Sequence, residues 1–333
     1  MSSEHAFAQR ERAARSTPLG ALPDFFIVGH PKSGTTALYQ MLRPHPQIYL
    51  PESKEPWFFA TELHERTPPR PGGTPTTLDE YRGWFRGAAP GQHIGEASPF
   101  YLWSRTAAAR IAAVVPAARI IAILREPVSF LHSLHLQFVE SYVEVEPDFR
   151  KALSLEAQRR EGRHIPRYTY WPKALLYSEH VRYVEQLQRY HAAFSHEQVL
   201  VLIYEEFRDD NEATVRRLLR FLEVDEEHPI SAREANPTVR VRSGRVHEAV
   251  HALSVGRGPV SLAVKGTLKA VTPRGLRRSA LRRAKRSLLF GAPRPADAGL
   301  VLELRRRFKG EVEALSEYLG RDLVTFWGYD RLD

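Results

Sequence analysis

Residues 24–43 have the sequence DFFIVGHPKSGTTALYQMLR, which passes from an apolar run through a glycine-containing turn into a helical pattern. The apolar run 24–29 predicts a buried strand, and the residues after the turn predict a helix that ends near Pro44. The turn between them, Gly29–Thr36 or GHPKSGTT, would direct free backbone N–H groups and the positive end of the helix dipole at an anion. The opening of the chain therefore predicts a strand, a phosphate-binding loop and a helix.

The rest of the chain repeats this alternation of strands and helices. Two further apolar runs predict buried strands, at 119–124 (RIIAIL) and 198–204 (QVLVLIY). Helical patterns occur at 104–114, from Pro127 to Glu140, and at 174–193, 211–222 and 300–319. Continuously apolar strands that alternate with helices predict the α/β class, with a central parallel sheet flanked by helices on both faces. We expect a polar leader at 1–23 and a single catalytic domain at 24–333.

The loop differs from that of a nucleoside triphosphatase. Gly29 and Gly34 have the spacing of a Walker A motif, but Thr35 and Thr36 stand where that motif has lysine followed by serine or threonine, and Lys32 lies two residues before the second glycine. The second strand ends in Arg125, whereas nucleotide hydrolysis usually needs an acid there to hold Mg²⁺. Arg125, together with Ser133 on the following helix, is suited to bind a second phosphate and is not suited to bind a metal ion. A P-loop kinase or nucleotide hydrolase remains the alternative.

Five motifs in this order resemble those of the sulfotransferases that use 3′-phosphoadenosine 5′-phosphosulfate (PAPS), in the heparan-type and bacterial branch. They are Pro31–Thr36 (PKSGTT), Lys54–Phe59 (KEPWFF), Gly95–Pro99 (GEASP), Arg125–Pro127 with Ser133, and Asn236 with Arg242-Ser243. The C-terminal segment 318–323 with Trp327 is also similar to that of the family. The resemblance covers about residues 24–245 and implies a P-loop-like sulfotransferase fold.

The resemblance also implies which residues bind PAPS and its product, 3′-phosphoadenosine 5′-phosphate (PAP). The 5′-phosphosulfate would be bound by Lys32, Ser33, Gly34, Thr35 and Thr36, and the 3′-phosphate by Arg125 and Ser133. Arg242 would close over that phosphate. This chain has NPTV where the family shows an NPSG-like run, so Arg240 is the alternative to Arg242.

Two residues are the candidates for catalysis of sulfuryl transfer. Lys32 would neutralise the charge that develops on the departing phosphate. Glu55 matches the glutamate that serves as the base in the heparan-type enzymes and would take the proton of the acceptor hydroxyl. Phenol-type members use a histidine, for which His30 is a better candidate than His132 or His135.

The acceptor is less defined by the sequence than the donor. Lys54, Trp57 and Glu96 are candidate acceptor-binding residues; Glu96 either orients Lys54 or an acceptor hydroxyl or has a structural role. The neighbouring aromatic residues fit either an acceptor cleft or core packing. A sugar, a lipid-linked glycan and a small metabolite are all compatible with this set.

The positive charge of the chain is concentrated in one segment. Eleven Lys and Arg and no acidic residue lie between Glu248 and Asp297, and without those eleven charges the net charge of +9 would become −2. This basic arm, 245–297, has a helical pattern at 273–290 that could bind an anionic membrane surface, line a cleft for an acidic substrate or face solvent. No motif for nucleic acid binding accompanies it.

The absence of cysteine fits the reducing cytoplasm, with peripheral contact at the inner membrane surface as an option. A non-catalytic membrane-binding module is the second alternative to an enzyme.

Overall fold

The computed structural model describes residues 20–63, 74–167, 169, 171–231, 240–241, 290–291 and 295–332. These residues form two compact units. The first contains the described residues up to Arg125 and those of 184–231, and the second contains residues 126–183 and the described residues from 240 onward. Arg242 and most of the basic arm, 245–289 and 292–294, lie outside the described residues.

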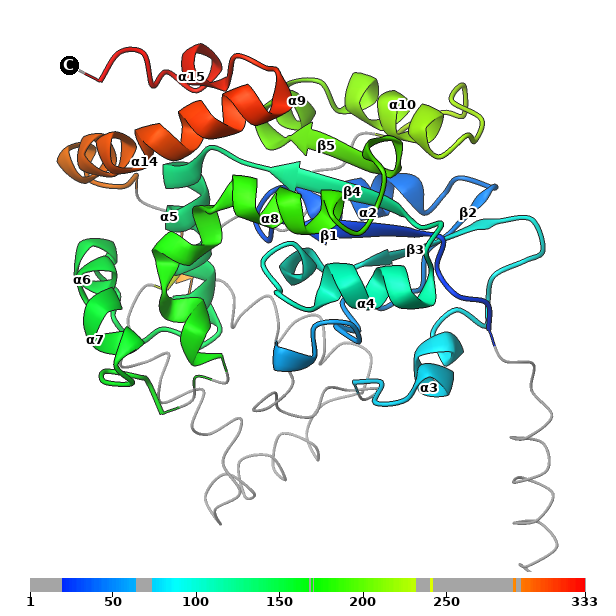
Figure 1. Cartoon of the computed structure of the whole chain (residues 1–333), viewed down its shortest axis with the longest axis horizontal. Helices are drawn as coiled ribbons and strands as arrows, with labels where there is room; N and C mark the ends of the chain where they lie inside the picture. Colours follow the sequence, from blue (N-terminus) through cyan, green and yellow to red (C-terminus); the bar gives the residue numbers. More distant parts are fainter. Residues whose placement is uncertain are drawn as a thin grey trace, which may run out of the picture. The chain divides into compact units, whose positions relative to one another are not determined.

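The first unit is built on a parallel sheet. Its strands are β1 (Phe25–Gly29), β2 (Ile48–Tyr49), β3 (His93–Ala97), β4 (Arg119–Leu124) and β5 (Val199–Ile203). They lie in the order β2-β3-β1-β4-β5, and every pair is parallel (Figure 1). The α/β class and the three strands predicted from the apolar runs are confirmed. The two-residue strand β2 was not predicted, because it is too short to give a pattern.

The strand order determines where a ligand site can form. From β1 the chain continues to β2 on one side of the sheet, and from β4 it continues to β5 on the other side. Parallel α/β sheets bind ligands at the carboxyl ends of strands where the connections diverge in this way. The loop after β1 and Arg125 after β4 therefore meet at one edge of the sheet.

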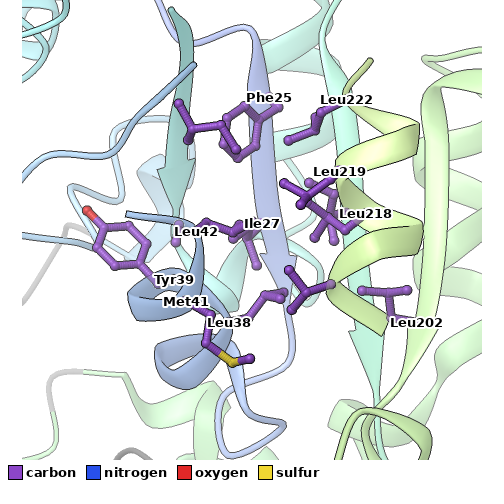
Figure 2. Packing of buried hydrophobic residues seen from close by; sticks show 14 of the residues in the cluster. Phe25, Ile27, Leu38, Tyr39, Met41, Leu42, Leu202, Leu218, Leu219 and Leu222 are labelled. Atoms are coloured by element: carbon purple, nitrogen blue, oxygen red, sulfur yellow. The ribbon is translucent and has the colours of Figure 1, made fainter. Parts of the chain in front are cut away.

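Helices cover the sheet of the first unit. They are α2 (Thr35–Leu42), α3 (Leu78–Gly83), α4 (Ala107–Val114), α8 (Tyr183–His191), α9 (Tyr204–Asp209) and α10 (Asn211–Phe221), with 3₁₀ helices η1 (Thr61–Leu63), η2 (Pro99–Tyr101) and η5 (His196–Gln198). Figure 2 shows side chains of α2 and α10 converging on Phe25 and Ile27 of β1. Complete burial of one such side chain contributes roughly 1.5–3 kcal/mol. The intervening residue, Phe26, points to the other face and packs on Phe59, with ring centroids 5.9 Å apart. Burial of both faces explains the continuously apolar sequence of β1.

The second unit is largely helical. It contains α5 (Pro127–Glu140), α6 (Phe149–Ser154), α7 (Glu156–Arg160), α14 (Ala298–Leu319), α15 (Leu323–Phe326), the 3₁₀ helices η3 (Pro172–Leu175) and η4 (Tyr177–Val181), and the antiparallel strands β6 (Arg240–Val241) and β7 (Phe290–Gly291). Pro127 occupies the first turn of α5 as predicted, and the Glu126 side chain caps that helix by accepting from the amides of Val128 and Ser129. The hydroxyl of Tyr329 donates to the same carboxylate over 2.7 Å, which joins the C-terminal segment to the start of α5.

The helix predicted over 174–193 is only partly correct. The α-helix α8 occupies the second half of the segment, whereas the first half forms η3 and η4. Leu176 and Arg182 interrupt the pattern with ψ values of 79° and 63°. The amide of Ser178 donates to the buried carboxylate of Glu156 over 2.8 Å. A tertiary contact therefore satisfies a donor that a helix would have satisfied, and apolar spacing alone does not reveal such a contact.

Candidate functional site

The loop between β1 and α2 presents donors to an anion. Gly34 is the N-cap of α2 with a φ of 82°, and among the described residues no side chain caps this helix. The N–H groups of a first helical turn have no acceptor within the helix itself, and an anion at this end of the helix can accept from them. The Ser33 hydroxyl is buried, and in the described part of the chain its Oγ has no hydrogen-bond partner. A buried hydroxyl without a partner is costly, so this atom fits a bound anion.

Gly34 is required by both its conformation and its surroundings. Its positive φ disfavours residues with a side chain, and a Cβ at this position would lie 2.9 Å from the ring of Phe207 and 3.2 Å from that of Tyr204. Both rings belong to α9, at the carboxyl end of β5. The close approach of α9 shapes the loop from outside.

Arg125 contacts the phosphate loop directly. Its Nη1 donates to the carbonyl oxygen of Lys32 over 2.7 Å, and its guanidinium carbon lies 4.6 Å from the ring centroid of Tyr204. The structure therefore brings together the two segments that the sequence assigned to opposite phosphates of one nucleotide. The sequence did not identify Tyr204 as a residue of the site. Its position directly after an apolar strand was a usable signal, because ligand sites form at the carboxyl ends of such strands.

Lys54 joins the phosphate loop to the candidate base. Its Nζ donates to Thr36 Oγ1 over 3.1 Å and lies 3.5 Å from Glu55 Oε1. The side chain of Glu55 is 28% exposed, so its carboxylate can meet an acceptor molecule. Burial lowers the pKa of Lys54, and the negative charge of Glu55 opposes that shift.

The segment 55–59 is strained and is attached to the end of β3. Glu55 and Trp57 have φ values of 67° and 55°, and non-glycine residues in such conformations cost of order 1–3 kcal/mol each. Three hydrogen bonds hold the segment. The amides of Glu55, Trp57 and Phe59 donate to Ala97 O, Ser98 Oγ and Tyr101 OH over 3.0, 3.3 and 3.2 Å.

Glu96 is a buried carboxylate beneath this segment. It is 1% exposed, and its Oε2 accepts from the hydroxyls of Tyr81 and Tyr101 over 2.6 and 3.2 Å. The pKa of Glu96 is raised to about 7, mainly by burial and slightly by the nearby charge of Glu55, against the lowering effect of the hydroxyls of Ser98, Tyr81 and Tyr101. The hydrogen bonds of Lys54 go to Thr36 and Glu55, so they do not support the expectation that Glu96 orients Lys54.

The raised pKa of Glu96 predicts a pH-dependent stability. Because the pKa rises from 4.5 to about 7 on folding, the folded state favours the neutral acid. The resulting stabilisation is complete below the unfolded pKa and is lost as the pH rises through 7. Relative to Glu96→Gln, the free energy of unfolding of the wild type should fall by roughly 3 kcal/mol between these limits. Urea unfolding at pH 4.5, 6 and 8.5 measures it, with the exposed Glu52→Gln as the control. Wild-type and Glu96→Gln curves that stay parallel across this range would show that Glu96 does not titrate there.

The structure locates some of the other predicted site residues. Trp57 is only 3% exposed, and its ring packs edge-to-face on Phe100, so the structure gives it a packing role. Ser133 is buried on α5 in the second unit. The shared binding of a 3′-phosphate by Arg125 and Ser133 stays a prediction. The assignment of Arg242 lies outside the described residues.

The histidines considered as alternative bases are packed. His30 is fully buried, and its Nε2 donates to Gln186 Oε1 over 2.7 Å. His135 is bonded to Tyr177 OH over 3.0 Å, and burial lowers its pKa to about 4. The ring of His132 lies 5.5 Å from that of Phe149. These contacts favour Glu55 over a histidine.

The described ranges contain neither a metal-binding cluster nor a membrane-spanning helix. No group of three or more His, Asp or Glu among those residues could hold a metal ion. Of the helices in the same ranges, none is both long and apolar enough to cross a membrane.

Comparison with known proteins identifies the family. The family model for the sulfotransferase domain matches residues 22–236. This chain belongs to the sulfotransferase family. The matched range includes the phosphate loop, Lys54, Glu55, Glu96 and Arg125, so all the residues of the site in the first unit are part of the sulfotransferase domain.

Individual relatives agree with this assignment. Carbohydrate sulfotransferase 15 of Mus musculus is 26% identical over 61% of this chain and 44% of its own length. The mouse heparan sulfate glucosamine 3-O-sulfotransferase 3B1 is 28% identical over 60% of this chain and 46% of its own length. The chain thus spans less than half the length of these curated relatives. A crystal structure of a sulfotransferase from Alicyclobacillus acidocaldarius is similar with a TM-score of 0.64 and 26% identity, over 93% of this chain and 100% of that chain.

Proposed function

We propose that this sulfotransferase transfers the sulfuryl group of PAPS to an acceptor hydroxyl and releases PAP. The contact between Arg125 and the phosphate loop carries the proposal. An arginine at the end of β4 and a donor-rich loop after β1 offer positive charge and N–H groups to two phosphates at separate positions. A nucleotide with phosphates on both the 5′ and 3′ oxygens matches that arrangement.

The residues of the loop have distinct roles in the proposal. Ser33, Thr35, Thr36 and the N–H groups at the start of α2 would bind the 5′-phosphosulfate, and Gly34 would allow the backbone to approach it closely. Arg125 would bind the 3′-phosphate together with Ser133, and Arg242 would close over it. Tyr204 would hold the guanidinium plane of Arg125 by stacking.

The transfer itself follows from the charges of the site. The acceptor oxygen forms a bond to sulfur while the bond between sulfur and the phosphate oxygen breaks. Glu55 takes the acceptor proton, and Lys32 offsets the negative charge on the departing PAP. Lys54, between Thr36 and Glu55, would contact the transferred group.

We propose a carbohydrate hydroxyl as the acceptor. Two kinds of relative carry carbohydrate sulfotransferase or heparan sulfate glucosamine 3-O-sulfotransferase in their names. Lys54 and the partly exposed Glu55 can donate to and accept from a sugar hydroxyl. We also propose that the enzyme works in a reducing compartment such as the cytoplasm, since the chain has no cysteine. Peripheral membrane contact through the basic arm belongs to the same proposal.

Calorimetry with three nucleotides tests the donor assignment. The wild type should bind PAP without metal and should bind ADP with Mg²⁺ at least tenfold more weakly, because the site offers donors to a 3′-phosphate. Arg125→Gln should weaken PAP binding by about 10–100-fold, since a charge-assisted hydrogen bond is worth roughly 1.5–3 kcal/mol. Adenosine 5′-phosphate, which lacks the 3′-phosphate, is the control ligand and should bind wild type and variant equally.

Three outcomes would contradict this assignment. Tighter binding of ADP with Mg²⁺ than of PAP would indicate a kinase or nucleotide hydrolase. Equal losses for PAP and adenosine 5′-phosphate in Arg125→Gln would show that Arg125 only shapes the loop through Lys32. A wild type that binds PAP but transfers no radiolabelled sulfate from PAPS to polysaccharides, phenols or cell extracts would support a non-catalytic module.

A further inference from the structure

One polar side chain in the interior of the first unit has no direct part in the proposed transfer. Glu96 interrupts the apolar strand β3 and is 1% exposed. A carboxylate is among the least favourable groups to bury, and it persists in a core only with strong hydrogen-bond donors around it. Glu96 Oε2 has two such donors, the hydroxyls of Tyr81 and Tyr101, whereas Glu96 Oε1 has no hydrogen-bond partner among the described residues.

One of these two donors, Tyr101, also holds the segment 55–59. Tyr101 OH accepts from the amide of Phe59 over 3.2 Å. A hydroxyl that gives its proton to a carboxylate turns its lone pairs toward other donors and becomes a better acceptor, because hydrogen bonds in a chain polarise one another. The carboxylate of Glu96 therefore strengthens and orients the attachment of the segment at Phe59.

The attached segment needs such support. Glu55 and Trp57 have positive φ values, and backbone strain of this kind persists only where the surrounding structure enforces it. The amide of Glu55 is itself fixed by Ala97 O, the residue after Glu96. The contacts at residues 55, 57 and 59 thus all come from the chain at or just beyond Glu96.

We propose that Glu96 is a positioning residue for sulfuryl transfer: through the hydroxyl of Tyr101 it holds the segment 55–59 in the conformation that presents Glu55. This inference rests on the proposed function of Glu55 as the base. Glu96 touches neither donor nor acceptor in this role. Its effect is therefore on the rate of the chemical step and not on nucleotide binding.

The neighbouring tyrosines provide a matched pair of variants. Tyr101→Phe removes the hydroxyl that links Glu96 to Phe59, whereas Tyr81→Phe removes a hydroxyl that donates to Glu96 alone. Both variants keep their aromatic ring. Glu96→Gln keeps the size of the side chain and removes its charge.

The kinetic test compares these three variants with the wild type. Glu96→Gln and Tyr101→Phe should each lower kcat by about 10–100-fold, because a small displacement of a catalytic group can have an effect of this size. KM and the Kd for PAP should change by less than about threefold, and the double variant should lose little more than either single variant, since both act on one linkage. Tyr81→Phe should keep kcat within about threefold of the wild type. Equal kcat losses in Tyr81→Phe and Tyr101→Phe, or an unchanged kcat in Glu96→Gln, would overturn the proposal.

Hydrogen exchange supplies a readout that does not depend on activity. The amide of Phe59 should exchange at least about tenfold faster in Glu96→Gln and in Tyr101→Phe, while Tyr81→Phe should leave its exchange rate unchanged. If the wild type neither binds PAP nor transfers sulfate, the proposed function fails while these exchange rates still decide the linkage. If the wild type is active and the exchange rates do not change, the positioning role of Glu96 is wrong and the proposed function stands.

Discussion

Replacement of Glu55 by Gln is expected to lower kcat for sulfuryl transfer by about 10²–10⁴-fold, the usual contribution of a general base. The amide has the size of the carboxylate but cannot take a proton from the acceptor. Its backbone stays as strained as before, because Gln has the same Cβ constraint at a φ of 67°. Lys54 should remain on Thr36, so the Kd for PAP should change little. Single-turnover transfer from labelled PAPS measures the loss directly.

Two further variants make the result for Glu55 specific. Glu52→Gln changes an exposed carboxylate of the same loop and should retain full activity. Glu55→Asp keeps a carboxylate as the base but places it farther from the acceptor, because the side chain is shorter. Its activity should lie between those of wild type and Glu55→Gln. If Glu55→Gln keeps kcat within about threefold of the wild type while folding normally, another group takes the proton and the base assignment is wrong.

Replacement of Lys32 by Ala is expected to lower kcat by about 10²–10³-fold, the typical effect of removing one group that stabilises charge in the transition state. The lysine would act on the departing phosphate, whose negative charge grows as the bond to sulfur breaks. Alanine keeps a Cβ at the φ of 62°, and the carbonyl that accepts from Arg125 is unchanged. The shape of the loop should therefore survive the substitution.

Two further variants separate the effect of the positive charge of Lys32 from the effect of its position in the loop. Lys32→Arg keeps the positive charge in a larger and planar group, so it should recover only part of the activity. Lys151→Ala, at an exposed lysine of α6, is the control for a general loss of positive charge. Equal activities of Lys32→Ala and wild type, with PAP bound normally by both, would exclude the role of Lys32 in transfer.

The relation between Lys54 and Glu55 shows how the site can carry both a base and a cation. Glu55 lies 3.5 Å from the ammonium group of Lys54, which in turn contacts Thr36 of the phosphate loop. Lys54 thus contacts both the candidate base and the phosphate loop through one side chain.

The sequence determined those features that depend on residues close to one another in the chain. The loop GHPKSGTT lies between an apolar strand and a helix, so its identification as a turn suited to an anion follows from neighbours a few residues away. RIIAIL followed by Arg125, Glu126 and Pro127 likewise defined β4, the start of α5 and a cation at the edge of the sheet. The parallel sheet itself follows from apolar strands alternating with helices.

Other features depend on segments that are distant in sequence, and these required the tertiary structure. Trp57 is buried on Phe100 and not displayed to an acceptor, because two loops some forty residues apart pack together. Tyr204 stacks on Arg125 across the interval between β4 and β5. The strained backbone at Glu55 is maintained by hydrogen bonds to residues at the end of β3. A non-glycine residue keeps such a left-handed conformation only where the surrounding structure stabilises it. Because these partners are distant in sequence, no local pattern could reveal them.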